Sequence, residues 1–117
     1  MPGSEVRFEP GDILIVPFPY TDQLAEKRRP ALVVSNPALE KLGYLWVAMV
    51  TSRRAESGMT GDVVIEDITL AGLPAPSVVR TAKIACIEPQ RVQRVAGKLT
   101  QGQREQVFNQ MHRFLGA

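Results

Sequence analysis

The chain has 117 residues, which is enough for one domain whose core needs neither disulfides nor bound metals. Hydrophobic residues make up 44% and charged residues 22%, a composition typical of a folded globular protein rather than a disordered one. Fourteen Lys and Arg residues exceed twelve Asp and Glu residues by two, a mild charge that permits a nucleic-acid partner without requiring one. We find neither a leader pattern nor an apolar run long enough to cross a bilayer, so we expect a cytoplasmic protein without a membrane partner.

The first half of the chain predicts three strands. Residues 1–10 lack periodicity and predict a loose N-terminal arm before the first strand at residues 13–16. A polar loop follows, and residues 31–35 predict a second buried strand because they are apolar and rich in β-branched side chains. Residues 38–43 allow a short turn of helix, and residues 44–50 predict a third buried strand that leads into a second polar loop.

The second half continues the same alternation of strands and loops. Residues 62–66 predict a fourth strand, and residues 77–88 predict one long strand or two joined ones. Residues 91–99 fit either a last strand or a helical turn, and periodicity does not decide between them. The single cysteine, Cys86, lies in an apolar run, so we expect a buried, unreactive thiol and a reducing compartment.

Residues 100–116 predict an amphipathic C-terminal helix. Thr100 followed by Gln103 matches a capping box. Apolar side chains recur at helical spacing at Val107, Phe108, Met111, Phe114 and Leu115. The opposite face carries Gln103, Arg104, Gln106, Gln110 and Arg113. Residues 1–117 therefore predict a single domain of α+β, mainly β class: a small, strongly bent sheet or barrel of short strands finished by one helix.

The polar ends of the predicted strands carry the candidate chemistry. Pro30 restricts the backbone of Arg29, so this guanidinium should leave the loop in a defined direction and could bind a phosphate. A solvated basic turn fits the same residues. Guanidinium, ammonium and hydroxyl groups lie at the ends of several predicted strands: Arg28, Arg29, Thr51, Ser52, Arg53, Arg54, Arg80, Thr81 and Lys83. Such side chains bind and neutralise phosphates.

Other site chemistries lack support in the sequence. There is no glycine-rich phosphate loop, no serine elbow and no Cys or His cluster at metal-ligand spacing, so we expect neither a metal nor a cofactor. The only histidine, His112, lies on the last predicted helix and should be a partly packed surface residue. RNA can still be cleaved without a metal if its own 2′-hydroxyl attacks the adjacent phosphorus, because the protein then only orients groups, exchanges protons and stabilises charge.

Four motifs, in this order, resemble the MazF/PemK toxins. They are Gly11-Asp12, the run from Arg29-Pro30 to Ser35, Val50-Thr51-Ser52, and Ser77-Val78-Val79. The resemblance implies a dimeric toxin of a type II toxin–antitoxin pair, with an SH3-like barrel, that cleaves single-stranded RNA as a metal-independent endoribonuclease. It also implies a cognate antitoxin, for which an acidic, partly disordered segment that folds on binding is the expected form.

The same resemblance suggests roles for individual residues. Arg29 matches the family's catalytic arginine and Thr51 its catalytic threonine. We expect RNA contacts from Arg28, Ser52, Arg53, Arg54, Arg80 and Lys83. The loop before Arg29 departs from the family pattern, so the general base is open between Glu26 and Asp22.

Two other functions fit the sequence. One is a CcdB-like toxin that targets gyrase. Such a toxin resembles the same fold but does not act on RNA. The other is a non-catalytic barrel that binds nucleic acid through its basic residues. Cleavage of RNA, which Arg29→Ala abolishes, distinguishes the endoribonuclease from both alternatives.

Overall fold

The computed structural model describes residues 5–18, 27–53 and 58–117. In these ranges, six strands form one antiparallel sheet in the order β4-β5-β3-β2-β1-β6. The strands are β1 Asp12–Phe18, β2 Lys27–Val33, β3 Leu45–Ser52, β4 Asp62–Val64, β5 Ser77–Ile87 and β6 Arg94–Lys98. The helices are α1 Pro37–Lys41, the 3-10 turn η1 Pro89–Arg91 and α2 Gln101–Phe114. This confirms the mainly β, α+β class with a C-terminal helix.

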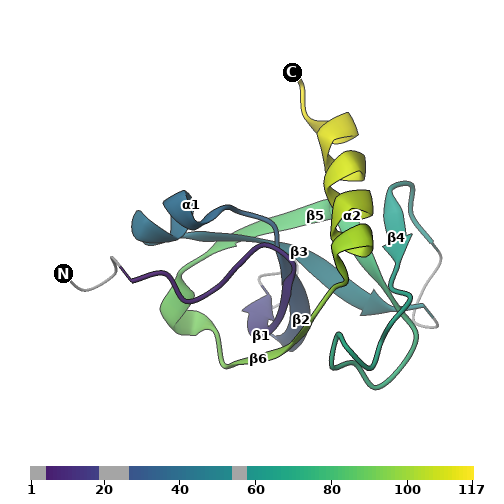
Figure 1. Cartoon of the computed structure of the whole chain (residues 1–117), viewed down its shortest axis with the longest axis horizontal. Coiled ribbons are helices and arrows are strands. Elements are labelled where there is room, and N and C mark those ends of the chain that lie inside the picture. The colour runs from purple at the N-terminus through teal and green to yellow at the C-terminus, as the bar shows by residue number, and fades with distance from the viewer. Residues whose placement is uncertain (1–4, 19–26, 54–57) are drawn as a thin grey trace.

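Both faces of the sheet are buried, which explains why its strands read as continuous apolar runs. Along β1 and β2, Leu14 and Ala31 belong to one apolar cluster, whereas the adjacent Ile13 and Leu32 belong to another. We call these the first and second clusters. Figure 1 shows α2 beside β4 and β5, and its Val107 is fully buried in the second cluster. The helix therefore covers only the second face.

The second strand begins earlier than predicted. We expected it at residues 31–35, but β2 spans Lys27–Val33 and includes Arg28, Arg29 and Pro30. The basic residues belong to the strand because they pair with β1, where Val16 lies opposite Arg29 and Pro17 opposite Arg28. Local composition suggested a loop, but the antiparallel partner holds this segment extended.

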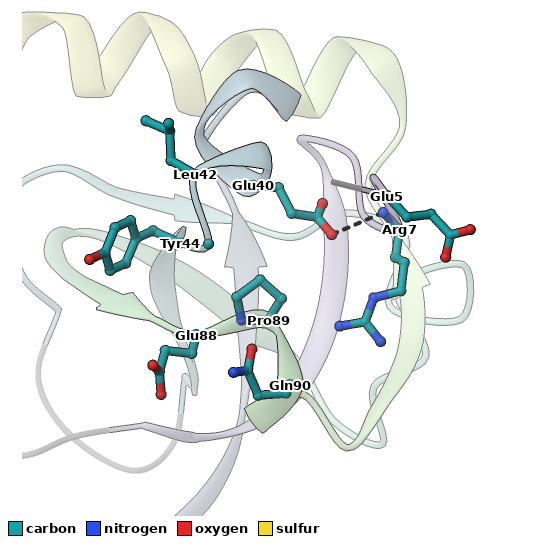
Figure 2. Close-up of a pocket in the computed structure, with 9 residues that line it drawn as sticks. Glu5, Arg7, Glu40, Leu42, Tyr44, Glu88, Pro89 and Gln90 are labelled. Carbon is teal, nitrogen blue, oxygen red and sulfur yellow. Dashed lines mark hydrogen bonds between the residues drawn. The ribbon is translucent and has the colours of Figure 1, made fainter. Parts of the chain in front are cut away.

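Residues 5–10 form no loose arm. Glu40, which is 2% exposed, accepts hydrogen bonds from the backbone N–H of Arg7 at 2.9 Å and of Phe8 at 3.1 Å. Figure 2 shows the bond to Arg7 from the side of a pocket of about 610 Å³. The Phe8 side chain packs in the first cluster, and the arm is thus attached to both α1 and the core.

The C-terminal helix begins as predicted, but one of its residues is used differently. The Thr100 hydroxyl accepts a hydrogen bond from Gln103 N–H at 3.2 Å, which confirms the N-cap. Gln103 was expected on the exposed face, yet it is 3% exposed. Its side chain joins the sheet edge, accepting from Glu66 N–H at 2.6 Å and donating to the Val64 carbonyl at 3.0 Å. This amide therefore attaches α2 to the end of β4.

The predicted long strand is a single element, β5, with an irregularity in its middle. Arg80 pairs with Met49, whereas Ile84 pairs with the preceding residue of β3, Ala48. Beyond this bulge Ile84, which pairs with Ala48 of the second cluster, is 42% exposed, whereas Ile87 is buried in the first cluster, so α2 leaves this part of the second face uncovered. Cys86 is consequently exposed, opposite Trp46, and the expectation of a buried thiol was wrong.

The undecided segment at residues 91–99 contains strand β6, which follows η1 and pairs with β1. Within the described ranges, no helix is long and apolar enough to span a membrane.

Candidate functional site

Arg29 and Thr51 lie on neighbouring strands, on the same face of the sheet. The β2–β3 ladder pairs Val33 with Val47 and Ala31 with Met49. The paired residues end at Ala31 and Met49, and Thr51 lies two residues beyond Met49 on the same side of its strand, while Arg29 lies opposite Val16 of the first cluster. Residues opposite each other in an antiparallel pair share a face of the sheet. Both side chains therefore lie on the face of the first cluster, at the polar ends of two core strands.

The two side chains differ in their access to solvent. Thr51 is 5% exposed, and its partner on β5 is Val78. Arg29 is half-buried, and its Nε atom is shielded from solvent. A guanidinium held against the apolar end of a sheet attracts a phosphate more strongly than one in bulk water, because the local dielectric constant is lower. A threonine hydroxyl beside it can donate a hydrogen bond to the same phosphate.

Three further predicted residues lie next to this pair. Arg28 is exposed, Ser52 is half-buried opposite Ser77, and Arg53 is exposed immediately after β3. The backbone N–H of Arg53 donates to the Pro76 carbonyl at 3.0 Å, which fixes where the chain leaves the strand. We call Arg28, Arg29, Thr51, Ser52 and Arg53 the candidate site.

The other predicted residues have different positions. Lys83 is exposed on β5, and its neighbour Ile84 pairs with Ala48, three residues before Thr51 on β3. It therefore lies apart from the candidate site. Arg54 and both candidates for the general base, Glu26 and Asp22, lie outside the described residues.

Arg80 is placed differently from our expectation. It is 2% exposed and forms a two-point ion pair with Asp62, from Nε to Oδ1 at 3.1 Å and from NH2 to Oδ2 at 3.0 Å. Burial alone raises the pKa of the Asp62 carboxyl. The hydrogen bonds from Arg80 and from Met59 N–H, with the charge of Arg80, outweigh burial and bring that pKa below its ordinary value. A guanidinium so engaged is better suited to position its surroundings than to follow an RNA strand.

Asp62 was missed as a residue of interest by sequence reasoning. A usable signal was present, because Gly-Asp occurs twice, at Gly11-Asp12 and at Gly61-Asp62, each time before a strand. The first pair was noted only as part of a family motif. Its repetition indicates that the chain uses the same turn at two strand entrances.

The pocket seen in Figure 2 lies elsewhere. Its polar lining includes Glu5, Arg7, Glu40 and Glu88, and none of the candidate-site residues belongs to that lining. Glu40 is already bonded to the backbone of the N-terminal segment. We therefore place the candidate chemistry at the polar ends of β2 and β3.

Comparison with known proteins identifies the family to which the chain belongs. The model of the family described as PemK-like, MazF-like toxin of type II toxin–antitoxin system matches residues 9–115. A comparison with curated protein sequences found no match.

Several solved structures are similar over nearly the whole chain. MazF from Deinococcus radiodurans has a TM-score of 0.73 at 20% identity, covering 97% of this chain and 99% of its own. The Mycobacterium tuberculosis toxin MazF-mt6 has a TM-score of 0.68 at 23% identity, covering 87% and 93%. An endoribonuclease in complex with its cognate antitoxin, from a mycobacterial species, has a TM-score of 0.73 at 15% identity, covering 94% and 96%. At these identities, the likeness establishes the fold.

Proposed function

We propose an endoribonuclease activity for this chain, which belongs to the PemK-like, MazF-like toxins of type II toxin–antitoxin systems. The proposed substrate is single-stranded RNA, cleaved in the cytoplasm without a metal ion. The observation that supports the proposal is that Arg29 and Thr51 lie on one face of the sheet, on neighbouring strands, with Arg28 and Arg53 exposed.

The proposed reaction uses the RNA's own nucleophile. The 2′-oxygen attacks the adjacent phosphorus and forms a bond to it, while the bond from phosphorus to the 5′-oxygen of the next nucleotide breaks. The 2′-hydroxyl gives up its proton to a base, and the leaving 5′-oxygen gains one. The products are therefore a 2′,3′-cyclic phosphate and a 5′-hydroxyl. Negative charge grows on the phosphoryl oxygens in the transition state, and this is where a protein donor lowers the barrier.

The proposed roles follow from the position of each group. Arg29 stabilises the phosphoryl charge and assists proton transfer, because its fork of donors matches two phosphate oxygens. Thr51 orients the same phosphate through its hydroxyl. Arg28, Ser52, Arg53 and Arg54 would bind the flanking strand. Glu26 and Asp22 are both candidates for the general base.

The function is tested by incubating the purified protein with a long single-stranded RNA in excess EDTA. We expect fragments with cyclic-phosphate ends, detected by mass spectrometry and by the lack of a free 3′-hydroxyl until the terminal phosphate is removed enzymatically. Intact RNA after incubation with the folded protein would contradict the proposal. Growth arrest on expression while cellular RNA stays intact would favour a gyrase-directed toxin instead.

We also propose that a cognate antitoxin occludes the candidate site. Two kinds of support exist: exposed cations at Arg28 and Arg53, and the fold similarity to an endoribonuclease solved with its antitoxin. An acidic segment that folds over these cations would compete with RNA through charge complementarity. A short neighbouring reading frame with a DNA-binding head and an acidic tail should encode it. Its product should inhibit cleavage at a one-to-one ratio of binding sites.

A homodimer is the expected assembly. Several large apolar side chains are exposed, among them Leu42 at 73%, Trp46 at 50% and Leu115 at 62%. Exposed apolar surface of this kind is typical of association sites. Sedimentation equilibrium at micromolar concentration should give twice the mass of the chain, and a monomer would contradict the proposal.

A further inference from the structure

The second face of the sheet is only partly covered by α2. Val107 of α2 is buried in the second cluster, but the same face is open at the start of β3 and the end of β5. There Trp46 lies opposite Cys86, and both side chains are exposed. Ile84, two residues before Cys86 and on the same face, is also exposed. An apolar stretch of the sheet is therefore in contact with solvent.

A groove borders this open stretch. Its volume is about 760 Å³, and it is lined by Trp46 and by residues of both α1 and α2. Figure 1 shows these two helices on the same side of the sheet. Eight of the twelve lining residues are apolar, among them Leu42 and Phe108. We call the groove, together with Ile84 and Cys86, the apolar trough.

The two flanks of α2 have opposite character. On one flank, Gln106 and Arg113 line a polar groove beside β4. On the other flank, Phe108 lines the apolar trough, and Leu115, seven residues later and so on the same side of the helix, is exposed. Covering the second cluster requires only the stripe around Val107. The apolar surface of α2 therefore extends beyond the buried cluster toward the apolar trough, as in a helix with a second partner.

The two edge strands of the sheet offer less for association. At β4, the Gln103 side chain is bonded to Glu66 N–H and to the Val64 carbonyl, which are groups that another strand would bind. At β6, Lys98 N–H donates to the Leu70 carbonyl at 3.1 Å. Backbone groups at both edges are thus already paired at these positions. We therefore expect association through a face of the sheet and not by addition of a strand.

The charges along the groove favour a second copy of the chain as the partner. The charged residues that line it are one acid and one base, Glu9 and Arg104, and Arg104 Nη1 is held by the Pro10 carbonyl at 3.1 Å. Such a pair attracts neither an acidic nor a basic partner as a whole. A two-fold arrangement can place each acid against the base of the other copy, so the surface is complementary to itself. The acidic segment of an antitoxin finds a better match in the exposed cations Arg28 and Arg53.

The extent of the surface also suits a dimer. One side of a stable interface buries about 800 Å² and uses about 20–30 residues. Twelve residues line the groove, and Ile84 and Cys86 extend it, so the apolar trough approaches the lower end of this range. Trp46, a half-exposed aromatic residue, is the type of side chain that contributes most to such interfaces.

We propose that the apolar trough is the surface through which two copies of this chain associate. Both copies use the same surface, so Trp46 of each copy packs against the groove of the other. This inference rests on the proposed homodimer and deepens it by assigning the interface. It leaves the candidate site accessible, because Arg29 and Thr51 lie on the opposite face of the sheet.

The unmodified protein carries its own reporters of this interface, because Trp46 is the single tryptophan and Cys86 the single cysteine. As protein concentration rises, we expect Trp46 emission to shift to shorter wavelength and alkylation of Cys86 by a maleimide to slow. Alkylation should slow about fivefold at a chain concentration about ten times the dissociation constant, where mass action leaves roughly one fifth of the chains monomeric. Sedimentation equilibrium on the same samples gives that constant.

A matched pair of variants tests the surface itself. Ile84→Glu and Val95→Glu each replace an exposed β-branched side chain on a strand, but Val95 lies on β6, opposite Leu14 and outside the apolar trough. We expect Ile84→Glu to raise the dissociation constant at least about 100-fold, because each copy would bury an unpaired charge. Val95→Glu should leave it within about twofold of wild type. Leu42→Glu, at a more exposed position of the trough, should act like Ile84→Glu and serves if the latter does not fold.

The possible results separate the interface from the other proposals. A dimer in which Cys86 reacts at the same rate at every concentration, and which Ile84→Glu leaves intact, would overturn the assigned surface while the homodimer stands. A chain that stays monomeric at high micromolar concentration would overturn both. Protection of Cys86 only after the antitoxin is added would assign the trough to that partner and overturn the proposal as well. A dimer that protects Cys86 but cleaves no RNA would support the interface, and only the ribonuclease function would fail.

Discussion

Thr51 lies on the same face of the sheet as Arg29, on the neighbouring strand and two residues beyond Met49, which pairs with Ala31. This relationship depends on two features of the strands that carry them. β2 begins before Pro30, so Arg29 is held extended by β1, and β3 continues through Ser52, so Thr51 is held by β5. Both groups are therefore positioned by paired strands and not by loops, which favours a preorganised site.

The hydroxyl of Thr51 should be needed for cleavage, whereas its methyl group should not. Thr51→Ala removes the donor proposed to orient the phosphate, and we expect RNA cleavage to fall on the order of 100-fold, as when one transition-state donor is lost. Thr51→Ser keeps the hydroxyl and should retain most activity. Single-turnover cleavage rates measure both. Equal losses in the two variants would assign Thr51 to packing alone, since it is 5% exposed.

The Asp62–Arg80 pair predicts a dependence of stability on pH. The pKa of Asp62 in the folded protein lies below its unfolded value of about 3.8, so folding favours the charged form. The resulting stabilisation is fully present above that unfolded value and is lost as pH falls through the lowered folded value. Urea midpoints of wild type and Asp62→Asn should therefore differ at pH 7, and the difference should shrink as pH falls below about 3.8. A difference that persists unchanged at pH 3 would contradict this assignment.

Gly61 should tolerate no side chain, unlike a glycine in α2. Its φ is +93°, and an added Cβ would come within 2.6 Å of the Phe114 ring. Gly61→Ala should therefore lower the free energy of unfolding by about 2 kcal/mol or more. Gly102, within α2, has no atom within 4 Å of such a Cβ, so Gly102→Ala should raise the free energy of unfolding by about 0.5 kcal/mol. Urea denaturation of the matched pair measures both, and similar effects would refute the packing of Phe114 on Gly61.

The carboxylate of Glu40 should contribute to stability despite its distance in sequence from its partners. Glu40→Ala leaves the N–H groups of Arg7 and Phe8 without their acceptor, which should cost about 2–3 kcal/mol. Glu40→Gln keeps one oxygen and should cost less. Glu105→Ala, at an exposed position of α2, is the control and should change the free energy of unfolding by less than about 0.5 kcal/mol. A neutral Glu40→Ala would mean that water replaces the carboxylate at both amides.

Much of the fold could be predicted because the strands are buried on both faces. Runs such as the one around Ile13 and Leu14 are apolar at every position and need no tertiary information to be identified. The start of β2 could not be found in this way. Its basic residues are extended only because β1 pairs with them, and pairing between strands leaves no local signal in either one.

Side-chain environments were harder to predict than strands. Gln103 has the spacing of an exposed helical residue. Its side-chain amide is buried because it forms hydrogen bonds with the backbone of Val64 and Glu66, at the end of a strand far away in the sequence. Cys86 lies in an apolar run, but it is opposite the exposed Trp46, on a part of the sheet that α2 leaves uncovered. That Arg29 and Thr51 lie near the ends of neighbouring strands could be anticipated, because each residue borders an apolar run in the sequence.

The central claim, that Arg29 performs RNA cleavage, is tested most directly by single-turnover cleavage of one long single-stranded RNA in EDTA by three proteins. These are wild type, Arg29→Ala, and Arg113→Ala as an exposed arginine of α2 on the other face. We predict cyclic-phosphate fragments from wild type and from Arg113→Ala at similar rates, and a rate at least about 1,000-fold lower from Arg29→Ala. Cleavage by Arg29→Ala at the rate of Arg113→Ala would contradict the claim.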